Sequence, residues 1–134
     1  MVFELNDKVM YWLDLVEYDI ETAKAMLRSS RYLYVGFMCH QAVEKALKAV
    51  VAKDCAPHEF PQKTHDLNKL AVQANLFDKM SEAQKDFIEY LRPMNIEARY
   101  PECKESALET LSDRQCAKTI KETEDFVCWI RTKL

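Results

Sequence analysis

The sequence contains a single glycine, Gly36, and four prolines in 134 residues. A sheet of many strands needs tight turns that favour glycine, so a chain with one glycine is poorly suited to it. Helices joined by a few loops need far fewer such residues. The sequence therefore predicts an all-α fold. It also excludes the Gly-rich phosphate loops of P-loop and dinucleotide-binding proteins.

Apolar residues recur at steps of three and four along most of the chain, which places them on one face of successive helices. We expect the first long helix to begin after Asn6 as its N-cap and the second to run from Tyr32 to Asp54. Thr64 is the expected cap of a short helix. The last two long helices begin at Ser81 and Ser112, each of which starts the capping-box pattern S-x-x-Q.

Four long amphipathic helices and one short helix bury their apolar faces most simply as an up-and-down four-helix bundle. The short helix is then an addition between the second and third long helices. The third long helix is expected to carry Phe87, Leu91 and Met94 on its buried face. Because 49% of the residues are hydrophobic and 31% are charged, we expect one globular domain over residues 1–134.

Charge and cysteine content limit the function. A formal net charge of −3 argues against a protein that holds nucleic acid along a basic face, so RNA is not a favoured ligand. Five cysteines, an odd number without a C-x-x-C pair, suit a reducing compartment. The N-terminus has no secretory signal pattern, and no apolar run is long enough to span a membrane. We expect a cytoplasmic protein without a membrane partner.

Three polar residues, His40, Glu44 and Lys48, lie four residues apart at the edge of the apolar stripe on the second helix. One interpretation is a solvated edge, in which Glu44 and Lys48 form an ion pair worth about 0.3–0.5 kcal/mol. The other is the wall of a cleft or a dimer contact. Tyr34 and Phe37 favour this second interpretation, because they lie on the same polar side without an obvious intramolecular partner.

Two segments are not explained by helical periodicity. The stretch "KTHDLNKL" places His65 and Asp66 at a helix start, where backbone N–H groups face outward. The stretch "IEARYP" ends a helix with Arg99 and Tyr100 just before a proline. Arginine offers a fork of donors for phosphate, and tyrosine offers a stacking plane with a hydroxyl. These residues are candidates for an anion site, or else a clamp that caps a helix end. The histidines follow no metal-ligand pattern, so we expect no metal.

Read together and in order, "QAVEKALKAVV", "THDLNKL" and "IEARYP" resemble the HEPN domain, the higher-eukaryote and prokaryote nucleotide-binding family. The resemblance extends from "DLVEYDIETAKAML" in the first helix to the last helix. It implies an up-and-down four-helix bundle with an extra short helix, usually dimeric. Members of the family include nucleotide-binding modules, toxins paired with a small nucleotidyltransferase, and metal-independent ribonucleases.

The resemblance implies a homodimeric module that binds a nucleotide or a nucleotide-like phosphate and uses no cofactor. We expect it to be the partner of a separately encoded minimal nucleotidyltransferase, in a toxin–antitoxin-like or related system. The residues expected to contact the ligand are Arg99, Tyr100 and His65. The residues expected to support them are Asp66, His40, Glu44 and Lys48.

Two alternatives remain open, an RNA-cleaving toxin and a purely structural interaction bundle. The family's ribonucleases carry an arginine, four to six further residues and then a histidine. Here Arg31 and His40 have eight residues between them, and no histidine follows Arg99. Cleavage would therefore require His65 or His40 to reach Arg99 through the fold, so the sequence favours a binding protein over an enzyme.

Overall fold

The computed structural model of the protein describes residues 2–55, 61–100 and 111–134, and all regular secondary structure in these ranges is helical. The elements are α1 (Val2–Arg28), α2 (Tyr32–Asp54), α3 (Leu67–Gln73), the 3-10 helix η1 (Phe77–Lys79), α4 (Glu82–Leu91), α5 (Met94–Glu97) and α7 (Asp113–Arg131). The predicted fold class, an all-α bundle with an inserted short helix, is confirmed. His58, one of the three histidines that follow no metal-ligand pattern, and Cys103, one of the five cysteines, lie outside the described residues.

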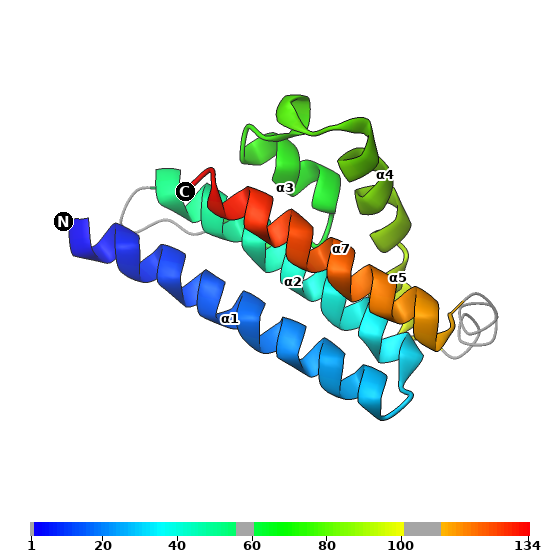
Figure 1. Ribbon diagram of the computed structural model, residues 1–134. Coiled ribbons are helices and arrows are strands. Elements are labelled where there is room, and N and C mark those ends of the chain that lie inside the picture. Colours follow the sequence, from blue (N-terminus) through cyan, green and yellow to red (C-terminus); the bar gives the residue numbers. More distant parts are fainter. Residues whose placement is uncertain (1, 56–60, 101–110) are drawn as a thin grey trace.

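Helix α2 is the centre of the bundle. It packs along its length against α1, and it also contacts α7, α5 and α3. Figure 1 shows α1 and α2 side by side, α7 next to α2, and α3 and α4 on the side away from α1. A helix surrounded in this way is covered on most sides, so some of its polar residues are buried together with its apolar ones.

The turn between α1 and α2 brings these two helices into their antiparallel pair. Ser30 adopts a left-handed backbone with φ of 58°, and Arg31 N–H donates to the carbonyl of Met26 at 2.8 Å. The predicted bounds of α2 are confirmed. The predicted start of α1 is wrong: Asn6 lies inside the helix, which already begins at Val2. Because residues 2–5 contain neither proline nor glycine, nothing in them ends the helix at Asn6.

Side-chain caps define the starts of three later helices. Ser81 and Gln84 form the predicted reciprocal capping box, and Ser112 Oγ accepts from Gln115 N–H at 3.1 Å. The predicted cap of α3 is wrong, because Asp66 and not Thr64 accepts from the first free N–H groups of that helix. Thr64 Oγ1 instead accepts from Asp66 N–H at 3.1 Å, which holds the cap residue in place.

The third long helix is interrupted, in contrast to the prediction of one helix through Met94. Helix α4 ends at Leu91, and Pro93 precedes the single turn of α5. Proline lacks an N–H and clashes with the preceding turn, so a helix rarely continues through it. Phe87, Leu91 and Met94 are nevertheless all buried, as predicted. The break redirects the chain so that α5 packs on α2.

Candidate functional site

The polar ladder of α2 lies inside the protein. His40, Glu44 and Lys48 are all buried, so the prediction of a solvated edge is wrong. The physical reason is that α1, α3 and α5 pack on α2, and that His65 of the loop before α3 contacts Glu44. The predicted ion pair between Glu44 and Lys48 is present, but in a setting where both charges must be satisfied.

Glu44 is the centre of this buried network. Its side chain is only 3% exposed, and its two oxygens have different partners. Oε2 lies 3.1 Å from Lys48 Nζ, and Oε1 lies 3.0 Å from His65 Nδ1. Lys48 Nζ also lies 5.6 Å from the centroid of the Trp12 ring on α1. The carboxylate is therefore held from both sides, as a buried charge requires.

His40 lies beside the same carboxylate but forms no hydrogen bond with it. Its Nδ1 is 3.8 Å from Glu44 Oε1, which is too long, and this buried atom has no partner within the described residues. Burial lowers the pKa of His40 from 6.5 to about 4; the charge of Glu44 opposes this shift, whereas those of His65 and Arg99 add to it. His40 is thus a neutral ring at physiological pH.

Next to this network is a cavity of about 240 Å³, which we call the α3–α5 cavity. Its described lining comes from the loop before α3, the Asp66 cap, and the chain from the end of α4 into α5. The lining residues are His65, Asp66, Arg92, Asn95 and Ile96. The arginine and the side-chain amide of this cavity offer several hydrogen-bond donors to an anion.

One arginine, Arg92, lines the α3–α5 cavity, and a second, Arg99, contacts its lining residue Asn95. Arg92 pairs with Glu89 at 3.0 Å and lies 3.9 Å from Asp66 Oδ2. Arg99 donates from Nη2 to Asn95 Oδ1 at 3.4 Å, and its guanidinium carbon lies 5.6 Å from the Phe37 ring centroid. The sequence argument that Phe37 lacks an intramolecular partner is therefore wrong.

The predicted site residues are only partly brought together. His65 and Asp66 line the α3–α5 cavity, and Arg99 reaches it through Asn95. Tyr100 is 51% exposed and is not among the residues that line it. Sequence reasoning missed Arg92 and Asn95, which the turn at Pro93 brings to the cavity. The arginine directly before that proline was a usable signal, because a helix ending there exposes its last side chains.

The family model described as HEPN domain matches residues 9–133, which is nearly the whole chain. The chain belongs to the HEPN domain family. No curated protein shows significant sequence similarity to it. The crystal structure of TT1696 from Thermus thermophilus is similar to this HEPN chain, with a TM-score of 0.78 and 18% sequence identity. That similarity covers 95% of this chain and 98% of the other, and it establishes the fold alone.

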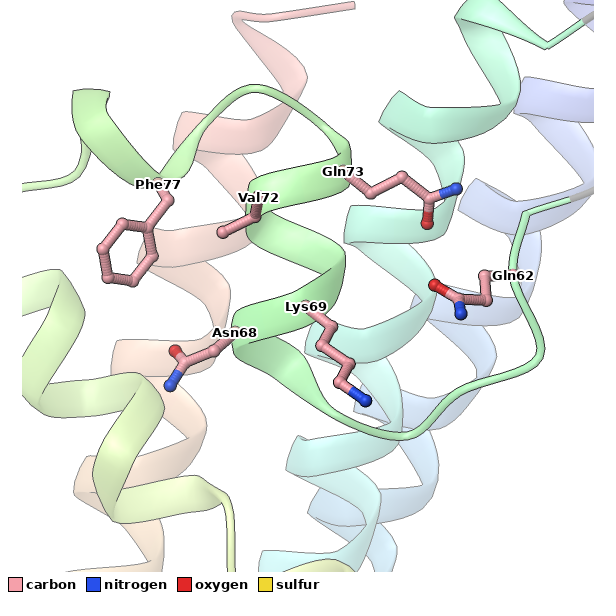
Figure 2. Close-up of a pocket in the computed structure, with 6 residues that line it drawn as sticks. All are labelled: Gln62, Asn68, Lys69, Val72, Gln73 and Phe77. Atoms are coloured by element: carbon pink, nitrogen blue, oxygen red, sulfur yellow. The ribbon is translucent and has the colours of Figure 1, made fainter.

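The HEPN bundle has a second surface cavity, of about 410 Å³, on the outward side of α3 (Figure 2). Figure 2 shows Phe77 on one side of α3 and Gln62 on the other, with Val72 and Lys69 between them. The remaining lining residues are Asn68 and Gln73. Its described lining has one cationic side chain, Lys69, and no arginine or histidine.

Two other properties concern the described part of this HEPN chain. No group of three or more His, Cys, Asp or Glu side chains is arranged there to hold a metal ion. None of the described helices has the length and hydropathy that a transmembrane segment requires.

Proposed function

We propose that this HEPN module binds a nucleotide or nucleotide-like phosphate, with the phosphate in the α3–α5 cavity. The observation that supports this most is that Arg92 and Asn95 line one cavity and that the Arg99 guanidinium donates to Asn95 Oδ1 at 3.4 Å. Guanidinium groups match phosphate oxygens in geometry and charge, and they need no glycine loop to do so. His65 adds a further polar group to the same cavity.

The base is proposed to lie against Tyr100. This residue follows Arg99 directly and is half exposed, so a planar ligand can reach it. Stacking of a base on an aromatic side chain contributes about 1–3 kcal/mol. In this arrangement His40, Glu44 and Lys48 support the contact residues without touching the ligand. Asp66 supports them from the cavity lining, where its Oδ2 lies 3.9 Å from Arg92.

We test nucleotide binding by isothermal titration with the four ribonucleoside monophosphates and triphosphates. At least one is expected to bind, and Arg92→Gln is expected to weaken its affinity about ten- to a hundredfold. Arg114→Gln, at the exposed start of α7, is the matched control and should bind normally. If no nucleotide binds the folded wild-type protein, the proposed function is wrong.

The protein partner is proposed to be a separately encoded minimal nucleotidyltransferase, as in toxin–antitoxin-like systems. Membership of the HEPN family supports this proposal. Co-expression with a nucleotidyltransferase of the same genome should yield a complex that co-elutes in gel filtration. Co-elution without any nucleotide binding would instead favour the purely structural alternative.

A second candidate function is metal-independent cleavage of RNA, which the contact between His65 and Glu44 favours. A histidine held by a carboxylate can take the proton of a ribose 2′-hydroxyl as its oxygen attacks the adjacent phosphorus. The bond between phosphorus and the 5′-oxygen of the next nucleotide then breaks, and this oxygen receives a proton. The products are a 2′,3′-cyclic phosphate and a 5′-hydroxyl. A labelled RNA incubated with the protein and a chelator tests this. Cleavage that His65→Gln does not abolish would count against it.

A further inference from the structure

The ring of His65 is held by one polar contact and otherwise faces outward. The side chain is 55% exposed, it lines the α3–α5 cavity, and its Nδ1 lies 3.0 Å from Glu44 Oε1. His65 belongs to a loop and not to a helix, so its orientation does not follow from a regular backbone. The contact with Glu44 therefore determines which edge of the ring meets the cavity.

The same contact determines where the proton of the ring lies. Glu44 pairs with Lys48 and is thus an ionised carboxylate, which can only accept hydrogen bonds. The hydrogen between Glu44 and His65 must then belong to Nδ1. A neutral imidazole with its hydrogen on Nδ1 has a free lone pair on Nε2. Nδ1 and Nε2 are separated in the ring only by Cε1, but their in-plane directions diverge widely, so this lone pair does not face Glu44.

The free Nε2 lone pair of His65 is a hydrogen-bond acceptor in a cavity whose arginine and side-chain amide offer donors. This combination selects a particular kind of ligand. Phosphate oxygens only accept hydrogen bonds when they are ionised, so they suit Arg92 and the amide of Asn95 but not a free Nε2 lone pair. The group that meets Nε2 must carry a hydrogen of its own. In a nucleotide, the neutral groups closest to the phosphate that do so are the ribose hydroxyls.

We propose that Glu44 is a positioning residue that fixes His65 as the Nδ1–H tautomer, and that Nε2 accepts a hydrogen bond from a ribose hydroxyl of the bound nucleotide. The ribose hydroxyl contact rests on the proposed function. The tautomer assignment does not, because it concerns the protein alone.

Nitrogen-15 NMR of the histidine side chains tests the tautomer assignment of His65 without a ligand. The variant His65→Gln is used to assign the signals. At mildly alkaline pH the wild-type His65 should show a protonated Nδ1 and an unprotonated Nε2. Removing both charges of the pair, with Glu44→Gln combined with Lys48→Met, avoids an unpaired buried lysine. In this variant the Nε2–H form should gain population. An Nε2–H form in the wild type, or no change in the folded variant, would overturn the positioning role.

Nucleotide analogues test the contact between Nε2 of His65 and a ribose hydroxyl, and they identify which hydroxyl it is. The nucleoside monophosphate that binds best is compared with its 2′-deoxy and 3′-deoxy forms, against the wild type and His65→Phe. One deoxy form should bind the wild type about two- to tenfold more weakly, and this difference should disappear in His65→Phe. An equal loss of affinity for the deoxy nucleotide in both proteins would overturn the hydroxyl contact. So would an NMR result showing that the His65 ring must be doubly protonated for the nucleotide to bind. Absence of any nucleotide binding would overturn it too, while leaving the tautomer result intact.

Discussion

His40 places a titratable ring in the core with an Nδ1 that has no hydrogen-bond partner among the described residues. Such a group is tolerated only in its neutral form, because a buried unpaired charge is costly. The low pKa of His40, about 4, expresses this cost. His40 therefore couples the stability of the bundle to pH.

The first prediction concerns this coupling. Since the pKa is lower in the folded state, the unfolded state takes up the proton first, and stability falls as pH drops from about 6.5 towards 4. From about pH 7.5 to about pH 5 the loss due to His40 should be about 2 kcal/mol. Urea unfolding at both pH values measures it. His40→Gln should show a smaller fall by that amount, and an equal fall would disprove the assignment.

The second prediction separates binding from structure at Arg99. Its guanidinium contacts Asn95 and the Phe37 ring, so a structural clamp is a real alternative to a ligand contact. Arg99→Lys keeps the charge but loses the planar fork, and we expect nucleotide affinity to fall about ten- to a hundredfold. Affinity and melting temperature are measured on the same samples. A lower melting temperature with unchanged affinity of the folded fraction would make Arg99 a structural residue.

At the residue scale, the sequence identified residues that the structure brings close together, but it did not predict their burial. Motif segments identified His65, Asp66 and Arg99, and the structure places all three at or beside one cavity. The burial of Glu44 was not predictable from its own helix, because the covering elements lie twenty or more residues further along the chain. The pairing of Glu44 with His65 is a long-range contact of this kind.

At the scale of elements, the single glycine determines how closely α5 packs on α2. A Cβ atom at Gly36 would lie 2.6 Å from Sδ of Met94, which is a clash. Met94 is buried at the start of α5, so its side chain has little room to move aside. The absence of a side chain at Gly36 thus positions α5, and with it Asn95 at the α3–α5 cavity.

The third prediction is that Gly36→Ala destabilises the protein despite its better helix propensity. The propensity gain is about 1 kcal/mol, whereas overpacking a core costs about 1–3 kcal/mol. We expect a net loss near 1 kcal/mol in chemical unfolding and weaker nucleotide binding, because α5 must shift. In a Met94→Ala background the same substitution should become stabilising. Destabilisation of equal size in both backgrounds would show that Met94 is not the cause.

Helix bounds were predictable where residues adjacent in the sequence define them. They were not predictable where packing against other parts of the fold defines them. The bounds of α2 and the capping box at Ser81 follow from adjacent residues, and both are confirmed. The start of α1 was misplaced because a capping residue such as Asn6 can also lie inside a helix. Thr64 and Asp66 are both good caps, and only the path of the loop decides between them.

At the scale of the whole molecule, the expected homodimer depends on the surface around Tyr34. This residue is 48% exposed and lines a groove of about 550 Å³ between the end of α1 and the start of α2. Two methionines, Met26 and Met38, make the groove partly apolar. Since Arg99 covers Phe37, the apolar contact predicted from the sequence is narrower than expected and centres on Tyr34.

The fourth prediction is a homodimer that Tyr34→Glu weakens, because a carboxylate would be desolvated in the contact. Sedimentation equilibrium at tens of micromolar, a typical order of magnitude for weak association, measures the oligomeric state. Tyr18→Glu, on the outward side of α1, is the control and should leave the dimer intact. A wild-type monomer at this concentration would remove the dimer from the account.

The central claim is that a nucleotide binds in the α3–α5 cavity beside the buried Glu44 network. NMR titration of the labelled protein with the tightest-binding nucleotide tests it most directly, because the second cavity has a different lining and the titration distinguishes the two. We predict chemical-shift changes at the side chains of His65, Asn95 and Arg99 that saturate at the same nucleotide concentration. In Arg92→Gln all of these changes should require more nucleotide. Shifts confined to the second cavity, at Gln62, Gln73 and Phe77, would contradict the claim.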